Sequence, residues 1–277
     1  MRIGVDAREL GTRPTGVGRY LRELLIRWQA APACAGHQLV LFTPRPDQHT
    51  WHMPSAGGAD VAWQFVPGTG GTLWEQRDLA RAARAAGLDV LFSPAYSAPL
   101  LASMPTVLAL HDVSFAAHPE WYSWRHGLRL RWVARWSGRR AHTVLTLTRF
   151  SADEIVRYLG VARERIRVIP LAVDYSDAPA PTGGRPLLTP VVLFVGSIFE
   201  RRHLPLLIEG LAIARRDVPG LRLHVIGENR TSPRQDLAAI ARAHGAGDAL
   251  VLHDYVPDEE LENAYASAGV FAFLSEY

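Results

Sequence analysis

The chain has 277 residues, of which 48% are hydrophobic and 21% charged, so it holds enough apolar material for a buried core. This composition excludes a disordered chain, a collagen-like chain and a small disulfide-stapled protein. The formal net charge is only +3, which gives no argument for a nucleic-acid-binding surface. Every basic residue is an arginine, so a motif that requires lysine can be met here only by arginine.

Two features predict a cytoplasmic location. Cys34 is the single cysteine, so no intrachain disulfide can form, which is typical of a reducing compartment. The start of the chain, residues 1–6, enters a strand-like run without the apolar stretch of a secretory signal. No window approaches the roughly 20 apolar residues of a membrane-spanning helix.

Short apolar runs alternate with stretches of helical period, which is typical of parallel strands joined by helices. Prolines and glycines cluster in residues 175–190 and predict a linker between an N-terminal domain, 1–174, and a C-terminal domain, 191–277. In the first domain we expect strands at 3–6, 38–42, 61–66, 90–92, 106–110, 143–147 and 167–169, and helices at 18–30, 73–86, 121–137 and 152–159. In the second we expect strands at 191–195, 221–226, 249–252 and 270–274, and helices at 203–216, 234–244 and 258–267. Ser151 and Glu154 predict a capping box at the start of the helix at 152–159.

A glycine pair opens the first expected helix. Gly16 and Gly18 would let the backbone approach a ligand closely, and the free amide groups of a helix start suit a phosphate. The pair does not form a dinucleotide-binding fingerprint, because Leu21 stands where the third glycine would be. An ordinary glycine turn is the alternative interpretation.

Two further groups follow expected strands, where a parallel sheet places its ligand crevice. His111 and Asp112 come directly after the strand at 106–110, and a histidine there can form hydrogen bonds or exchange a proton near neutral pH. Gly196 and Ser197 lead to Arg201 and Arg202, and two guanidinium groups at a helix entry suit a diphosphate. The alternatives are a histidine bonded to its own loop and a solvated basic turn.

Other phosphate-binding and metal-binding motifs are absent. The sequence contains no Asp-x-Asp, no His-Glu-x-x-His and no glycine-lysine phosphate loop. We therefore expect chemistry without a metal and without a cofactor.

Taken together, these motifs resemble the retaining glycosyltransferases of family 4, over residues 2–277. The resemblance implies the α/β fold called GT-B, in which two Rossmann-like domains with parallel sheets face each other across a cleft. It rests on the loop at 16–20, on Leu110-His111-Asp112, on the runs 168–174 and 223–227, on Gly196 with the turn at Arg201 and Arg202, and on the run 256–277.

The resemblance also implies roles. A nucleotide diphosphate sugar would bind mainly to the second domain as a co-substrate, and a glycan or lipid-linked acceptor to the first. His111 and Asp112 would be the catalytic pair, with His111 near the anomeric centre of a transferred hexose of the mannose or glucose type. Gly16, Gly18, Gly196, Ser197, Arg201 and Arg202 would bind the donor phosphates, in a reaction without a metal.

The sequence departs from the family pattern in two places. Arg202 stands where the family has a lysine, and the family's Glu-x7-Glu motif would begin after Tyr277. We therefore expect a fragment with an incomplete second domain. A nucleotide-sugar epimerase of the same architecture and a two-lobed small-molecule binding protein are the alternative functions.

The helix expected at 121–137 allows two interpretations. Mixed tryptophan and arginine suit a peripheral contact with the inner face of a membrane. Alternatively, the tryptophans pack in the core while the arginines reach outward, which is the interpretation we favour. Trp121, Trp124, Leu128, Trp132 and Trp136 share one side with Arg125, Arg129 and Arg135, and Leu130, Val133, Ala134 and Ser137 fall opposite.

Overall fold

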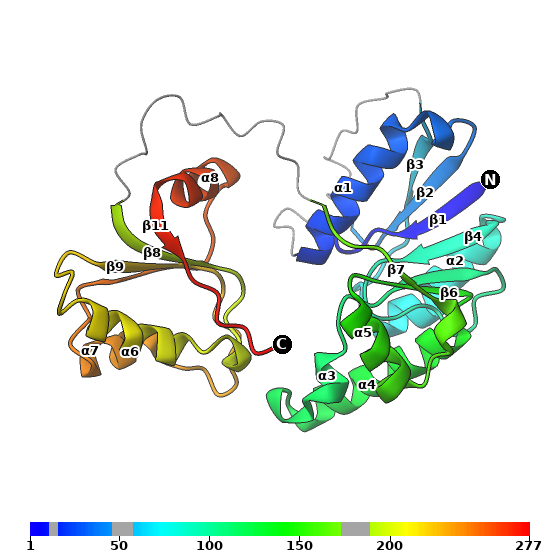
Figure 1. The fold of residues 1–277 in the computed structure, drawn as a ribbon. Helices are drawn as coiled ribbons and strands as arrows, with labels where there is room; N and C mark the ends of the chain where they lie inside the picture. The colour runs from blue at the N-terminus through cyan, green and yellow to red at the C-terminus, as the bar shows by residue number, and fades with distance from the viewer. Residues whose placement is uncertain (11–15, 46–57, 173–188) are drawn as a thin grey trace. The chain divides into compact units, whose positions relative to one another are not determined.

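The computed structural model describes residues 1–10, 16–45, 58–172 and 189–277, which form two compact units (Figure 1). Unit 1 comprises Met1–Pro119 and Trp124–Ala172, and unit 2 comprises Glu120–Ser123 and Val173–Tyr277. The linker expected at 175–190 lies outside the described residues as far as 188. Its last two residues, 189 and 190, belong instead to the first strand of unit 2.

Unit 1 is built on a seven-stranded sheet of order β3-β2-β1-β4-β5-β6-β7, in which every neighbouring pair is parallel. The chain runs outward from β1 to β3, returns to β4 on the other side of β1, and continues to β7. A reversal of this kind opens a ligand crevice at the carboxyl ends of the strands beside it. The strands are β1 (Arg2–Asp6), β2 (Gln38–Thr43), β3 (Asp60–Phe65), β4 (Val90–Ser93), β5 (Thr106–Ala109), β6 (Thr143–Thr146) and β7 (Ile166–Val168).

Both faces of this sheet are covered by helices, as the continuous apolar runs of its strands require. Alternate residues of β2 point to opposite faces. Leu39 and Leu41 belong to a core cluster with Leu21 of α1 (Gly16–Ala30). Val40 and Phe42 belong to a second cluster on the other side.

The helical segments follow the expected order. The second core cluster includes Trp74 of the π-helical turn η3 (Trp74–Leu79), which continues into α2 (Ala80–Ala85). The remaining helices of unit 1 are α3 (Ser114–Ala117), α4 (Trp124–Arg140) and α5 (Arg149–Glu154), which continues into the π-helical turn η5 (Ile155–Leu159). Short 3-10 turns occur at η1 (Pro32–Cys34), η4 (Pro119–Trp121) and η6 (Arg163–Arg165).

The capping box predicted from Ser151 and Glu154 is wrong. Helix α5 begins three residues earlier, and its N-cap is Thr148, whose side chain accepts a hydrogen bond from the backbone N–H of Ser151 at 3.0 Å. A threonine at this position satisfies one of the unpaired amide groups of the first turn just as a serine would. The short helix α3 was not expected from the sequence, because one helical turn carries no apolar period.

The favoured interpretation of the tryptophan helix is also wrong. Trp124, Trp132 and Trp136 are 71%, 56% and 43% exposed, so they lie outside the core. Trp121 precedes the helix, in the 3-10 turn η4. The helix instead buries its small residues, Gly127, Val133, Ala134, Ser137 and Gly138.

Unit 2 has a four-stranded parallel sheet of order β10-β9-β8-β11. Neighbouring residues of β8 again pack on opposite faces of the sheet. Phe194 packs in a cluster with α6 and α7, whereas Leu193 packs with residues of α8. The elements are β8 (Thr189–Val195), η7 (Glu200–Arg202), α6 (Leu204–Ala214), β9 (Arg222–Ile226), α7 (Leu237–Ala243), β10 (Leu250–His253), α8 (Asp258–Ser267) and β11 (Ala268–Phe271). No helix in the described part of the chain has both the length and the apolar character to cross a membrane.

Candidate functional site

In unit 1 the predicted histidine lies directly beyond β5. The Nε2 atom of His111 lies 2.9 Å from the carbonyl oxygen of Pro94, and the ring meets Tyr20 and Tyr96 edge to face, with centroids 4.8 and 5.8 Å away. Burial lowers the pKa of His111, against the opposing effects of the Pro94 carbonyl and the Asp112 carboxylate. The imidazole is therefore held in place, and burial favours its neutral form.

Asp112 is held by three hydrogen bonds. One carboxylate oxygen accepts a bond from the hydroxyl of Tyr96 at 3.0 Å. The other accepts bonds from the backbone N–H and the hydroxyl of Ser114, at 2.9 and 2.7 Å. These partners make Asp112 the link between the loop after β4 and the start of α3, which fixes the segment that carries His111.

The glycine pair lies in the first turn of α1, after the carboxyl end of β1. Gly16 is exposed, and a Cβ added there would meet no atom of the described residues within 4 Å. Gly18 is buried. The residues just before Gly16 lie outside the described ranges, so the phosphate-binding role of this turn stays a prediction.

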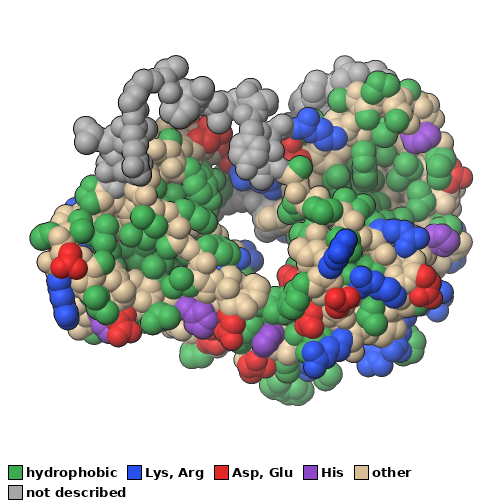
Figure 2. Space-filling model, in the orientation of Figure 1, with side chains coloured by type: hydrophobic (Ala, Val, Ile, Leu, Met, Phe, Trp, Pro, Cys, Tyr) green, Lys and Arg blue, Asp and Glu red, His purple; other side chains and the backbone are tan. Residues whose placement is uncertain are grey.

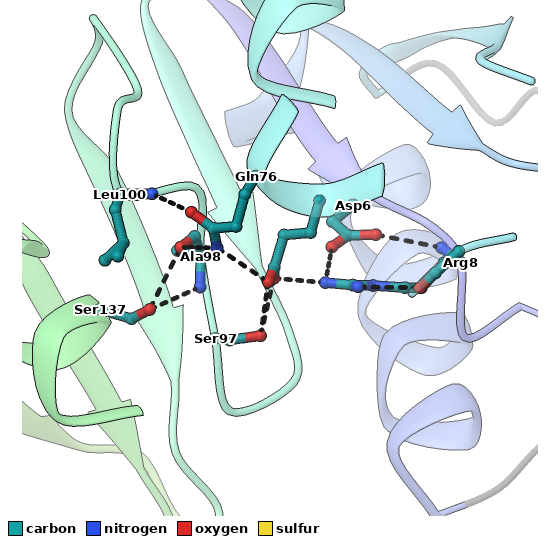
Figure 3. A network of polar contacts seen from close by, with 9 residues as sticks. Asp6, Arg8, Gln76, Ser97, Ala98, Leu100 and Ser137 are labelled. Carbon is teal, nitrogen blue, oxygen red and sulfur yellow. Dashed lines mark hydrogen bonds and ion pairs between the residues drawn. The ribbon is translucent and has the colours of Figure 1, made fainter. Parts of the chain in front are cut away.

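A buried ion-pair network lies at the carboxyl end of β1 (Figure 3). The guanidinium of Arg8 contacts the carboxylates of both Asp6 and Glu75, whose side chains are each only 1% exposed. Burial raises the pKa of Asp6 to about 6, although the charge of Arg8 opposes the rise. Arg8 also bonds to the carbonyl oxygen of Gly70 at 3.1 Å and lies over the ring of Trp74.

The same network fixes the loop that follows β4. The hydroxyl of Ser97 donates to Glu75, with oxygen distances of 2.7 and 2.9 Å. The side chain of Gln76 donates to the carbonyl of Ala98 and accepts from the N–H of Leu100 (Figure 3). Because this loop also carries Pro94 and Tyr96, the network supports the two residues that hold His111 and Asp112.

Sequence reasoning missed this network. Asp6 and Arg8 are 67 or more residues from Glu75 in the chain, and no local pattern joins them. The one available signal was that Asp6 ends the first strand, at the edge of the sheet where His111 follows another strand.

In unit 2 two glycines meet at the carboxyl ends of β8 and β9. Gly227 has a positive φ of 154°, and a Cβ added to it would collide with the backbone carbonyl of Gly196. The two strand ends are therefore packed at a spacing that only glycine permits. A Cβ added to Gly196 would collide with the guanidinium of Arg202, so this arginine lies directly against the strand end.

The predicted arginines lie together in η7, one loop beyond β8. Among the described residues neither Arg201 nor Arg202 forms a salt bridge; their guanidinium groups lie over the rings of Phe199 and Phe273, at 4.3 and 4.5 Å. The Nε of Arg202 is buried without a hydrogen-bond partner among these residues. Burial, and then the neighbouring charge of Arg201, lower the pKa of Arg202. Both features are typical of a cation that awaits an anionic ligand.

A pocket of about 350 Å³ opens beside these strand ends. Its walls include Gly227 and Asn229 after β9, Asp254 after β10, and Asp236 at the start of α7. Asn229 is fixed by bonds to Thr231 and to the carbonyl of Gln235. Only Gly227 of this wall was singled out from the sequence, because the other residues belong to no recognised motif. The pocket offers carboxylate and amide groups to a ligand, together with the guanidinium of Arg234, which also lines it.

A metal site is not formed by the described part of the chain, where no group of three His, Cys, Asp or Glu side chains could hold an ion. The expectation of chemistry without a metal stays a prediction.

The architecture agrees with solved glycosyltransferases of the GT-B class, which confirms the expected fold class. The structure of Anabaena HepE, in complex with UDP and glucose, matches with a TM-score of 0.68 and 17% identity, over 99% of this chain and 74% of that one. A glycosyltransferase from Rickettsia africae matches with a TM-score of 0.57 and 11% identity, over 99% of this chain and 72% of that one.

The sequence matches two family descriptions, Glycosyltransferase Family 4 over residues 14–177 and Glycosyl transferases group 1 over residues 182–277. The chain therefore belongs to glycosyltransferase family 4, as its motifs predicted.

Curated relatives match part of the chain. D-inositol 3-phosphate glycosyltransferase of Xylanimonas cellulosilytica is 31% identical over 143 residues, 46% of this chain and 34% of that protein. Mannosylfructose-phosphate synthase of Agrobacterium fabrum is 27% identical over 50% of this chain and 34% of that protein. The 2-deoxystreptamine glucosyltransferase of Streptomyces kanamyceticus is 32% identical over 47% and 35%. The match thus spans about a third of each relative.

Proposed function

We propose that this chain belongs to an enzyme that moves a hexose from a nucleotide diphosphate sugar to a glycan or lipid-linked acceptor. The observation that carries the proposal is the pair Arg201 and Arg202. Two adjacent guanidinium groups lie beyond the carboxyl end of β8, without an acidic partner among the described residues, and one is half-buried. Charge-assisted bonds to a diphosphate would satisfy both.

The chemistry follows from that charge. As the bond between the anomeric carbon and the diphosphate oxygen breaks, its electron pair stays on the diphosphate. Positive groups held in place next to that oxygen stabilise the developing charge, and here Arg201 and Arg202 supply it without a metal ion. We propose that the acceptor oxygen attacks from the same face, so that the configuration is retained, and that its proton passes to the departing diphosphate.

The donor nucleoside has a candidate position. The pocket at the ends of β9 and β10 contains Asn229, Asp236 and Asp254, whose oxygens can accept hydrogen bonds from a ribose or a base. In the same proposal, Gly196 and Ser197 contact the phosphates through their backbone. The names of the relatives and the glucose bound to HepE support a hexose of the mannose or glucose type.

Unit 1 has the complementary role in this proposal. His111, neutral and held by Pro94, would contact the transferred sugar. Gly16 and Gly18 would contribute helix-start amides to the phosphates. Asp112 would act through the position of His111, since three bonds already occupy its carboxylate. A lipid-linked acceptor would be reached through a peripheral membrane contact of residues 121–136.

Titration calorimetry with UDP, GDP and ADP tests the proposal on the chain itself. We expect one nucleoside diphosphate to bind, and the double variant R201Q/R202Q to weaken that binding at least tenfold, or roughly 1.4 kcal/mol. The matched control R216Q/R242Q changes the net charge equally at two exposed positions and should bind as the parent does. Equal affinity of R201Q/R202Q and the parent would refute the assignment of the arginines, and no binding of any diphosphate would refute the donor site.

A further inference from the structure

Helix α4 presents a continuous exposed stripe. Trp124, Leu128, Trp132, Trp136 and Arg140 follow one another at every fourth residue, and all five are exposed. Residues four apart are neighbours on the surface of an α-helix, and each such step turns by about 40°, so the five side chains wind across the exposed half of the helix. The rings of Trp132 and Trp136 are in contact, with centroids 6.3 Å apart. Large apolar side chains gathered on an exposed face mark an interaction site.

The charge on this helix has one sign. Among its 17 residues are six arginines and no acidic residue. Arg125, Arg129 and Arg135 are exposed beside the tryptophans. Figure 2 shows arginine and hydrophobic side chains, with a few acidic ones among them, over the part of unit 1 where Figure 1 places α4 and α5. A partner for this face must therefore be both apolar and anionic.

The opposite face of α4 fixes its orientation. The hydroxyl of Ser137 bonds to the backbone of Ala98 on both the N–H and the carbonyl side, at 3.1 Å each. A Cβ added to Gly138 would touch the side chain of Val161, so the helix lies close against its neighbour. These contacts keep the tryptophan stripe turned toward solvent.

The last residue of the stripe lines a pocket of about 440 Å³. Arg140 lies there with Arg165 and His142, and the other lining residues are apolar apart from Thr106. The pocket is at the amino ends of β5 and β6, the opposite edge of the sheet from His111. Arg165 is held at its wall by a bond of 2.9 Å from its guanidinium to the carbonyl of Arg139. None of the described residues that line it is acidic, so the pocket suits an anion.

We propose that α4 docks on an anionic phospholipid bilayer, with one lipid phosphate held in this pocket between Arg140 and Arg165. Trp124, Trp132 and Trp136 enter the headgroup layer, where indole rings are favoured, and the flanking arginines meet lipid phosphates. The inference deepens the membrane contact of the proposed function, and it does not depend on which sugar is transferred.

The arrangement favours a bilayer over other anionic partners. A nucleic-acid duplex would use the arginines but would leave the line of tryptophans and Leu128 in water, because its bases are already stacked on one another. A bilayer uses both kinds of side chain together, and its lipid phosphates are anions that suit the basic pocket at the end of the stripe.

Sedimentation of the chain with vesicles tests this proposal. We expect the chain to bind vesicles of phosphatidylcholine with phosphatidylglycerol at low salt, to be released at high salt, and to bind pure phosphatidylcholine at least tenfold more weakly. The stripe variant W132S/W136S and the pocket variant R140Q/R165Q should each lose at least tenfold in vesicle affinity. All four positions are exposed, so the variants should keep the circular dichroism and melting temperature of the parent.

Matched controls separate this effect from general charge or apolarity. R216Q/R242Q removes the same charge as the pocket variant, and L206S/I213S removes two exposed apolar residues of α6. Both should bind vesicles as the parent does. Phosphorus NMR with inorganic phosphate gives a second arm, in which the pocket variant should lose a weak phosphate interaction.

Several outcomes would overturn the proposal. These are equal binding to neutral and anionic vesicles, parental binding by either variant, or phosphate binding without vesicle binding, which would make the pocket a site for a soluble anion. Dimerisation that is abolished by W132S/W136S, without vesicle binding, would assign the stripe to a second copy of the chain. Nucleotide binding is measured separately, so its failure would leave this result unchanged.

Discussion

The Nε2 atom of His111 lies 2.9 Å from the carbonyl oxygen of Pro94. Because a carbonyl only accepts hydrogen bonds, Nε2 must carry the proton, and the neutral ring keeps its lone pair on Nδ1. The bond to Pro94 therefore selects one tautomer of His111, in which Nδ1 can accept a hydrogen bond from a sugar hydroxyl.

Nitrogen-detected NMR of labelled histidine can test this tautomer. We expect His111 to carry its proton on Nε2 at pH 7 and to titrate below the ordinary value of 6.5, because burial disfavours the charged ring. The variant H111Q assigns the signal. A proton on Nδ1, or a midpoint above 6.5, would contradict the geometry.

Tyr96 should stabilise unit 1 through its hydroxyl. The change Y96F keeps the ring against His111 and Phe115 but leaves a carboxylate oxygen of Asp112 without that donor. We expect a loss of about 1 kcal/mol in the free energy of unfolding, measured in urea. Y158F removes a hydroxyl from η5, away from His111, and serves as the control. Equal stability of Y96F and Y158F would show that the bond to Asp112 contributes nothing.

Asp6 should make unit 1 less stable as the pH rises. Its pKa is raised from 3.8 to about 6 by burial, so between these values the folded chain binds more protons than the unfolded chain. The contribution of Asp6 is therefore complete below pH 4 and is lost as the pH rises through 6, a change of roughly 3 kcal/mol.

Urea unfolding of the parent and of D6N, measured from pH 4 to pH 7, tests this linkage. The difference in unfolding free energy between the two proteins should shift in favour of D6N across that range. A difference that does not change with pH would mean that Asp6 is not buried as described.

Gly227 and Gly210 offer a matched pair in unit 2. In G227A the added methyl group would collide with the backbone of Gly196 at a positive φ, whereas in G210A it would meet nothing within 4 Å. We expect G227A to lose at least about 2 kcal/mol of stability. G210A, within α6, should gain about 0.5–1 kcal/mol, since alanine is the better helix former. A tolerated G227A would disprove the close packing of β8 against β9.

Much of the fold could be predicted because apolar residues recur with a different period in strands and in helices. The run at 38–42 falls in β2, and the run at 258–267 coincides with α8. Helix ends were less predictable, since Thr148 and Ser151 are both good caps and only the path of the chain decides between them. The burial of α4 was misjudged because the helix buries only glycine, alanine, serine and Val133 on that side, and the period of the sequence does not reveal how much room the core has.

Some residues of the candidate site could likewise be predicted from the sequence, and others could not. His111 and Arg202 could be predicted because each follows a strand of its own sheet, and a parallel sheet brings the carboxyl ends of its strands to one edge. Arg8 and Glu75 could not be found, because their pairing depends on how η3 packs against β1. Long-range ion pairs leave no local pattern in a sequence.

The carboxylate of Glu75 forms an ion pair with Arg8 and accepts a hydrogen bond from Ser97, so substitutions at these positions in unit 1 should influence one another. Replacing Glu75 would remove a carboxylate partner from both the buried guanidinium of Arg8 and the hydroxyl of Ser97. Replacing Ser97 alone would leave the ion pairs of Arg8 intact. Effects at these positions should therefore not add, and a double-mutant cycle would record a large coupling between them. Over evolutionary time such residues would be exchanged together or kept together. The sequence of the loop after β4 would then depend on the sequence of η3, which is distant in the chain.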